Sequence, residues 1–152
     1  MRFRGTGLIV FGLALSSCSA IGIDGSTRQF SGVWLYEFEG STFVEGATST
    51  PAQRPSYREA AWLDFQADEP RLRQQVEHVG YDSNRECYTV QPFRISFMGH
   101  RTFRPFGAGH MSLWRSQMTV ERMISVERLG PAFCYGNEVP PAPAADPGPL
   151  RP

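Results

Sequence analysis

The sequence contains no lysine, so arginine carries all of the positive side-chain charge. Arginine suits bidentate contacts to carboxylates and phosphates, but codon bias in a GC-rich genome explains the missing lysine more simply. The chain also lacks an excess of charge of either sign, with 15 basic and 15 acidic side chains. A general nucleic-acid binder needs a strong basic excess. That class of function is therefore excluded, and no nucleic-acid partner is expected.

Recognisable catalytic motifs are also missing from the chain. It contains no Gly-x-Ser-x-Gly, no glycine-rich phosphate loop, no His-Glu-x-x-His and no Cys-x-x-Cys, which are the spacings that mark nucleophilic, phosphate-binding, zinc and redox sites. The sequence thus predicts no catalytic residue and no cofactor. It favours a binding or scaffolding protein over an enzyme.

No apolar run is long enough to cross a membrane, since a spanning helix needs roughly 20 such residues. The most apolar stretch is Leu8–Leu15, and it follows a start that carries Arg2 and Arg4 but no acid. Two small residues, Ser16 and Ser17, come next. A charged start, a short apolar segment and small residues are typical of a secretory signal peptide. We therefore expect residues 1–17 to be removed.

The four residues Leu15–Cys18 resemble the lipobox of bacterial lipoproteins, a leucine and two small residues before a cysteine. The resemblance implies that Cys18 receives acyl chains such as palmitate, and two chains give stable anchoring. Ser19, where an aspartate often signals inner-membrane retention, favours the periplasmic side of the outer membrane. Residues 18–29 are small and polar and predict a flexible tether. The alternative is an ordinary secreted protein cleaved elsewhere, for instance after Ala20.

Two cysteines remain once Cys18 is assigned, namely Cys87 and Cys134. An even pair in an exported chain predicts a disulfide bond. The alternative, a thiol nucleophile or metal ligand, has no accompanying Cys-His spacing in its favour.

Alternating side chains begin at Phe30. Trp34 and Tyr36 fall on one face of a predicted strand, and Val33 and Leu35 fall on the other. Other strands are expected over residues 42–45, 60–65, 87–90, 93–98 and 102–106. Residues 71–79 and 110–129 fit either helix or strand, and β-branched residues favour strand in the second segment.

Short strands separated by Gly and Pro predict an all-β domain over residues 30–136. We expect a mainly antiparallel small barrel or sandwich, with room for one short helix. Within it, a three-residue turn at Gly99–Arg101 would join residues 93–98 to 102–106 and place Phe97 opposite Phe103. Half of the 12 prolines lie in residues 137–152, which predicts an extended or disordered tail.

Gly32-Val33-Trp34 resembles the Gly-x-Trp that opens the first strand of lipocalins. The resemblance implies a carrier of a small apolar ligand, with a cavity lined by Trp34, Trp62 and Trp114. The plainer alternative is that these tryptophans fill the core.

Two further sets of residues are candidates for binding or catalysis. His100 and His110 each follow a glycine, which places both at turns, where together they could bind a metal or act as acid and base in a small enzyme. Arg94, Arg101 and Arg104 alternate with aromatic residues in a stretch without acids. They would suit an anionic envelope partner, such as lipopolysaccharide, peptidoglycan or an acidic protein. In both cases, solvated surface residues are the alternative.

Taken together, the sequence predicts a lipid-anchored cell-envelope lipoprotein that acts as a binding or scaffolding module. A lipocalin-like carrier and a small histidine-dependent enzyme remain as alternatives.

Overall fold

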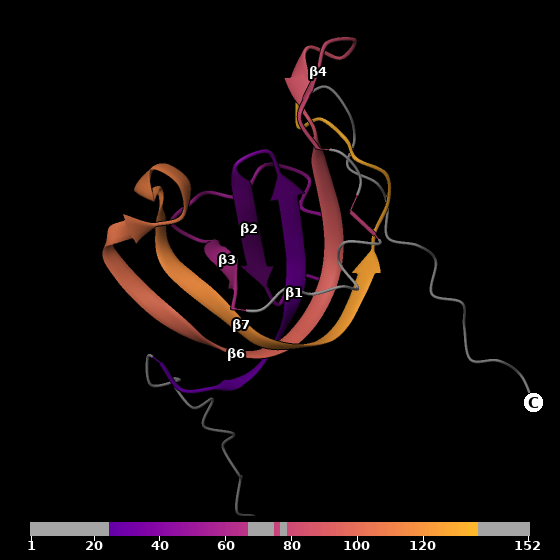
Figure 1. Cartoon of the computed structure of the whole chain (residues 1–152). Coiled ribbons are helices and arrows are strands. Elements are labelled where there is room, and N and C mark those ends of the chain that lie inside the picture. The colour runs from indigo at the N-terminus through magenta and orange to yellow at the C-terminus, as the bar shows by residue number, and fades with distance from the viewer. Residues whose placement is uncertain (1–24, 67–74, 77–78, 137–152) are drawn as a thin grey trace, which may run out of the picture.

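A computed structural model describes residues 25–66, 75–76 and 79–136 of the chain. Five strands form a closed barrel in the order β1–β2–β3–β7–β6, and β4 and β5 form a separate two-stranded sheet (Figure 1). The elements are β1 (Arg28–Glu37), β2 (Gly40–Glu45), β3 (Ala61–Phe65), β4 (Tyr81–Asp82), β5 (Cys87–Tyr88), β6 (Val90–Ala108), the 3₁₀ helix η1 (His110–Ser112) and β7 (Trp114–Arg128). The prediction of a small all-β fold is confirmed, and the barrel replaces the sandwich alternative.

The alternation of β1 is confirmed by its burial on both faces. Phe30 and Trp34 pack into the main core, while Val33 and Leu35 pack into a second cluster behind the strand. The main core consists of Phe30, Trp34, Phe43, Ala61, Leu63, Phe93, Ile95, Phe97, Met118, Val120 and Met123. Burying each large apolar side chain contributes about 1.5–3 kcal/mol, so this filled interior dominates the stability of the barrel.

A hydrogen-bonded chain ties the first three strands together inside the barrel wall. The Trp34 indole Nε1 donates to Ser41 Oγ at 3.0 Å, and the same hydroxyl donates to the Leu63 carbonyl at 2.7 Å. The polar atom of a buried tryptophan is thereby satisfied, as burial requires. The barrel then closes where β3 runs parallel to β7, while the other neighbouring strands are antiparallel.

The predicted hairpin over residues 93–106 is wrong, because β6 continues through it as one strand of 19 residues. Phe97 lies opposite Met123 and Phe103 lies opposite Ser116, both on β7. Gly99 marks a close approach of strands and not a turn. A Cβ atom on Gly99 would lie only 2.0 Å from the carbonyl oxygen of Thr119, which is one of the reasons for glycine inside a strand.

Several boundaries also differ from the sequence-based expectation. β1 starts at Arg28 and not at Phe30, and the turn between β1 and β2 lies at Phe38–Glu39 and not at Gly40–Ser41. The strand favoured within residues 110–129 is confirmed as β7, preceded by η1. The leader, most of the tether, the tail and most of residues 71–79 lie outside the described residues. Within the described ranges, no helix is long and apolar enough to cross a membrane.

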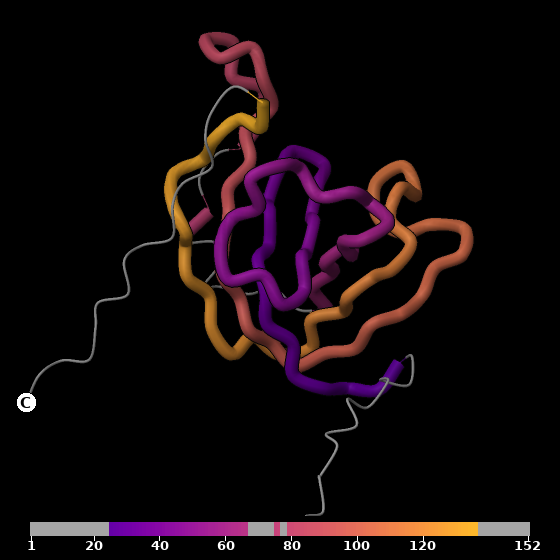
Figure 2. The backbone as a smooth tube through the Cα atoms, turned by 180° about the vertical axis from the view of Figure 1, so that it is seen from behind, coloured from indigo at the N-terminus to yellow at the C-terminus, as the bar shows by residue number. Residues whose placement is uncertain are grey.

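The chain after β7 returns to the start of β6 and is held there. Phe133 and Val90 exchange two backbone hydrogen bonds of 2.8 and 3.0 Å, and the yellow and salmon segments run side by side in Figures 1 and 2. Cys134 is fully buried and is bonded to Cys87 on β5, with 6.1 Å between the two Cα atoms. The structure thus contains the predicted cysteine pair.

Candidate functional site

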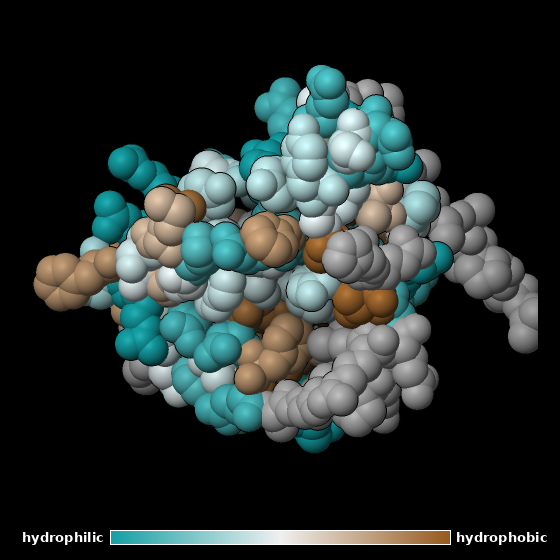
Figure 3. Space-filling view, turned by 45° about the horizontal axis from the view of Figure 1, so that its top comes forward, coloured by the Kyte–Doolittle hydropathy of each residue, from teal (hydrophilic) through white to brown (hydrophobic). Residues whose placement is uncertain are grey.

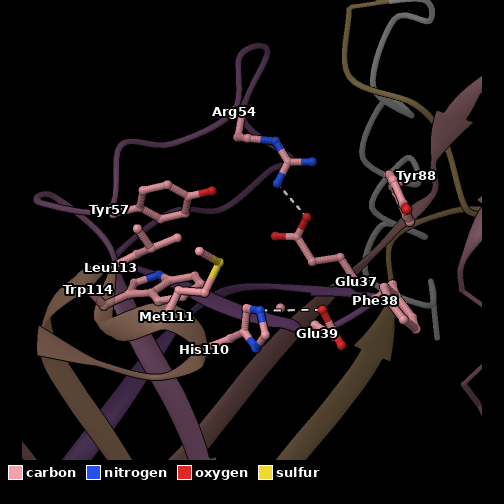
Figure 4. A pocket seen from close by; sticks show the side chains of 11 residues that line it. Glu37, Phe38, Glu39, Arg54, Tyr57, Tyr88, His110, Met111, Leu113 and Trp114 are labelled. Carbon is pink, nitrogen blue, oxygen red and sulfur yellow. Dashed lines mark hydrogen bonds and ion pairs between the residues drawn. The ribbon is translucent and has the colours of Figure 1, made fainter.

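A groove opens at the end of the barrel where the β1–β2 turn, β5 and η1 come together (Figure 4). Its volume is about 310 Å³. The lining residues are Glu37, Phe38, Glu39, Gly40, Arg54, Tyr57, Tyr88, His110, Met111, Leu113 and Trp114. These residues come from segments far apart in the sequence, so the fold alone brings them together.

The two walls of the groove are apolar and partly exposed. On one side Tyr57 packs edge-on against Trp114, with ring centroids 4.7 Å apart, beside Met111. On the other side Phe38 stacks on Tyr88 at 5.9 Å. Met111 is 76% exposed, and Phe38 and Tyr88 are each 53% exposed. Exposed apolar side chains that gather at one concave site are typical of a binding surface.

Charged and polar groups rim these walls. Arg54 forms an ion pair with Glu37, and His110 Nε2 lies 3.4 Å from a Glu39 carboxylate oxygen (Figure 4). Trp114 is 2% exposed, and its indole Nε1 has no hydrogen-bond acceptor within the part of the chain that the structure describes. A buried donor without an acceptor costs about 1–3 kcal/mol. A ligand carbonyl or hydroxyl that reached it would remove that cost.

The backbone at the groove is held in uncommon conformations. Glu39 and Met111 both have φ of +53°, and a left-handed residue other than glycine costs roughly 1–2 kcal/mol. Gly109, with φ of +68°, lies so close to Trp62 that a Cβ atom would be 2.2 Å from its ring. This contact fixes η1 against the barrel and thereby places His110 and Met111 at the groove. Such conformations often occur at functional sites.

Arg54 also links the groove to the C-terminal segment of the domain. Its guanidinium lies 5.4 Å from the centre of the Tyr135 ring, and the Tyr135 hydroxyl donates to the Pro51 carbonyl at 3.3 Å. Burial raises the pKa of Tyr135 to about 12. This tyrosine is therefore neutral at physiological pH, and it positions Arg54 through its ring and not through charge.

The two candidate histidines have separate carboxylate partners. His100 lies within β6, so its predicted place at a turn is wrong, and its Nδ1 is 2.8 Å from Glu121. The hydrogen bond from His100, followed by that from Thr27, holds the pKa of Glu121 below its usual value. His110 pairs with Glu39 at the groove. Among the described residues, no three metal-ligating side chains form a cluster, so the geometry does not favour a shared metal site.

The three tryptophans lie in different surroundings: Trp34 belongs to the main core, Trp114 lines the groove, and Trp62 packs against Trp114. Trp34 stacks on Phe93 inside the barrel at 5.1 Å, whereas Trp62 packs edge-on against Trp114 at 4.8 Å, and neither of these two is a member of the main core. The described side chains of the main core pack against one another inside the barrel, where a carrier would need a cavity. This packing favours the core interpretation of Trp34 over the lipocalin-like one.

The three candidate arginines all lie on β6 but do not converge. Arg94 binds Glu127 at 3.0 Å and the Thr48 carbonyl at 2.9 Å. Arg101 contacts Glu45 at 3.3 Å and Ser116 at 2.9 Å. Arg104 is exposed near the end of the strand. Two of the three are thus occupied within the protein.

Sequence reasoning identified only Trp114 and His110 among the residues that line the groove. Glu37, Arg54 and Tyr57 gave no signal, because an ion pair between distant segments leaves no pattern in the sequence. The run from Gly107 to Leu113 was the one available hint. Two glycines within three residues, Gly107 and Gly109, are a sequence signal for a break in a strand.

No known protein family, curated protein or solved structure matches this chain. A function has to be argued from its own residues. The groove can bind a ligand of mixed character, with apolar groups between the aromatic walls and polar groups at the two ion pairs.

Proposed function

We propose that this protein is a lipid-anchored component of the cell envelope that binds a ligand or partner protein in the groove, on the periplasmic side of the outer membrane. The groove is the observation that carries the binding role. The lipobox-like Leu15–Cys18 supports the anchor, and the Cys87–Cys134 pair suits an oxidising compartment.

The composition of the groove favours binding over catalysis. Among the described residues, those that line it include no serine, threonine, cysteine or lysine, which are common nucleophiles in enzymes. Both of its carboxylates are engaged, Glu37 with Arg54 and Glu39 with His110. Aromatic walls with a few polar groups are the arrangement that orients an amphipathic ligand. Candidate ligands are lipopolysaccharide, peptidoglycan and an envelope protein, each of which carries both polar and less polar groups.

The anchor predicts a specific mass for the protein extracted from membranes. We expect intact mass spectrometry to show the loss of residues 1–17 and the gain of acyl chains on Cys18. The Cys18→Ser variant should lose the acyl mass and leave the membrane fraction, because the anchoring free energy comes from about 0.8 kcal/mol for each buried methylene. An unmodified wild-type chain in the soluble fraction would refute the anchor.

The groove predicts a single crosslinked product in native cells. We expect a photoreactive phenylalanine analogue at Phe38 or at Tyr88 to give an adduct of the same added mass, because their rings stack on each other at 5.9 Å. The matched control is Ile124 on β7, which is 37% exposed and lies outside the groove. Adducts of different added mass at Phe38 and Tyr88, or equal crosslinking from Ile124, would show that the groove is not the binding site.

A further inference from the structure

The β6–β7 hairpin carries an exposed apolar surface that adjoins the groove and shares Met111 and Leu113 with it. We call the segment from Arg101 to Gln117 the hairpin tip. Its exposed apolar side chains are Phe103 (59%), Phe106 (94%), Met111 (76%) and Leu113 (40%). In Figure 3, hydrophobic residues project from the side of the molecule where β6 and β7 join. Exposure of this extent on a protruding segment marks an interaction surface.

The charge of the hairpin tip has one sign. The segment contains Arg101, Arg104 and Arg115 and no aspartate or glutamate. Arg115 donates to the Pro105 carbonyl at 2.8 Å, which holds its guanidinium beside the bend that presents Phe106. The ladder between β6 and β7 is interrupted from Phe103 to Ala108. In this ladder, residues 104–107 therefore pair with no residue of β7, and residues 104–106 are exposed to solvent.

The start of the described chain lies at the base of this hairpin tip. Gly25 N donates to the Arg101 carbonyl at 3.0 Å, and in Figures 1 and 2 the indigo end of the chain lies on the same side as the β6–β7 connection. Seven residues lead from Cys18 to Gly25, and an extended chain of that length reaches at most about 25 Å. A lipid on Cys18 would thus hold this side of the barrel near the bilayer.

We propose that the hairpin tip docks on the anionic surface of the bilayer that holds Cys18, with Phe103 and Phe106 inserted among the headgroups and Arg104 and Arg115 beside the lipid phosphates. This proposal rests on the lipid anchor of the proposed function and adds a second contact that orients the barrel. Aromatic side chains with flanking cations are the features of interfacial membrane binding.

A second copy of the chain fits the hairpin tip less well. In a two-fold contact the same patch meets itself, so Arg104 and Arg115 would face their own copies with no acid from the tip between them. Anionic phospholipid supplies the missing negative charge. It also supplies an apolar layer for Phe106, which has 94% of its surface in solvent.

Flotation with vesicles tests this contact apart from the anchor. The probe is the processed chain, residues 18–152, with Cys18→Ser, so that no acyl chain contributes. We expect it to float with vesicles of phosphatidylcholine and phosphatidylglycerol and to bind pure phosphatidylcholine much less. Adding Phe106→Ser should lower the partition coefficient about ten-fold, and adding Arg104→Gln should lower it about five-fold. Phe106 is almost fully exposed, so its replacement leaves the fold intact.

The matched control is Tyr81→Ser, which removes an aromatic ring of 58% exposure from β4. β4 lies at the opposite end of the barrel from the chain start (Figure 1), so this variant should bind vesicles as well as the parent chain. Failure of the parent chain to bind, or equal binding by the Phe106→Ser variant, would overturn the proposal. If acylated Cys18 were still found by mass, the anchor would stand without the docking surface. Sedimentation as a dimer that Phe106→Ser dissolves would assign the tip to a second copy and also overturn it.

Discussion

Replacing Cys87 and Cys134 together by alanine is expected to lower the free energy of unfolding by about 4 kcal/mol, the loop-closure value for a crosslink of this span. The two residues are 47 positions apart, and the loop between them includes the whole of β6 and β7. Without the crosslink, the last segment keeps the Phe133–Val90 hydrogen bonds, the second apolar cluster and single hydrogen bonds at Ala132 and Tyr135. Chemical denaturation of both proteins measures the difference.

The reductant provides the control for this prediction. It should destabilise the wild-type protein by a similar amount and leave the double alanine variant unchanged. Removing the disulfide should also loosen the groove, because Tyr135 follows Cys134 directly and its ring contacts Arg54. Equal stability of the two proteins would mean that the native thiols are not bonded. In that case the cysteine pair would no longer be an argument for an exported protein.

The strands were predictable where aromatic and β-branched residues gather between turn signals. The alternation around Trp34 correctly gave the two buried faces of β1, because a period of two in side-chain character follows directly from strand geometry. β-branched residues favoured strand over helix for the segment that is β7. Each of these strands could be identified from its own residues alone.

The prediction of a hairpin over residues 93–106 was wrong because glycine occurs both in turns and inside strands that approach another strand closely. Gly99 was interpreted as a turn, but it is needed where β6 passes close to Thr119 of β7. Only the partner strand, about twenty residues further along the chain, distinguishes these cases. The closure of the barrel by parallel β3 and β7 was equally hidden, since nothing in either strand alone specifies its neighbour.

The groove was out of reach of sequence reasoning for a related physical reason. Its ion pairs join Glu37 to Arg54 and Glu39 to His110, and each pair depends on where the turn between β1 and β2 faces. The sequence predicted Trp114 as a cavity residue and His110 as a functional residue. It could not predict that both would meet Phe38 and Tyr88 at one end of a filled barrel.

The filled barrel itself gives the second large prediction. Phe97 is fully buried, stacks on Phe30 at 5.5 Å and packs edge-on against Phe43 at 5.3 Å. Phe97→Ala should lower the free energy of unfolding by about 3–5 kcal/mol, because it removes apolar contact and leaves a cavity that rigid neighbours cannot close. Denaturant unfolding measures the loss. Phe103→Ala on the same strand, at a position 59% exposed, should change stability by no more than about 0.5 kcal/mol.

The same pair of variants separates a binding module from an apolar-ligand carrier. A cavity lined by apolar side chains stays dry and binds small apolar molecules such as benzene. We therefore expect Phe97→Ala to bind benzene and to recover stability in its presence, while the wild-type protein and Phe103→Ala do not. A wild-type protein that bound benzene with Phe97 in place would have space inside the barrel. The barrel interior, and not the groove, would then be the main binding site, as the lipocalin-like alternative requires.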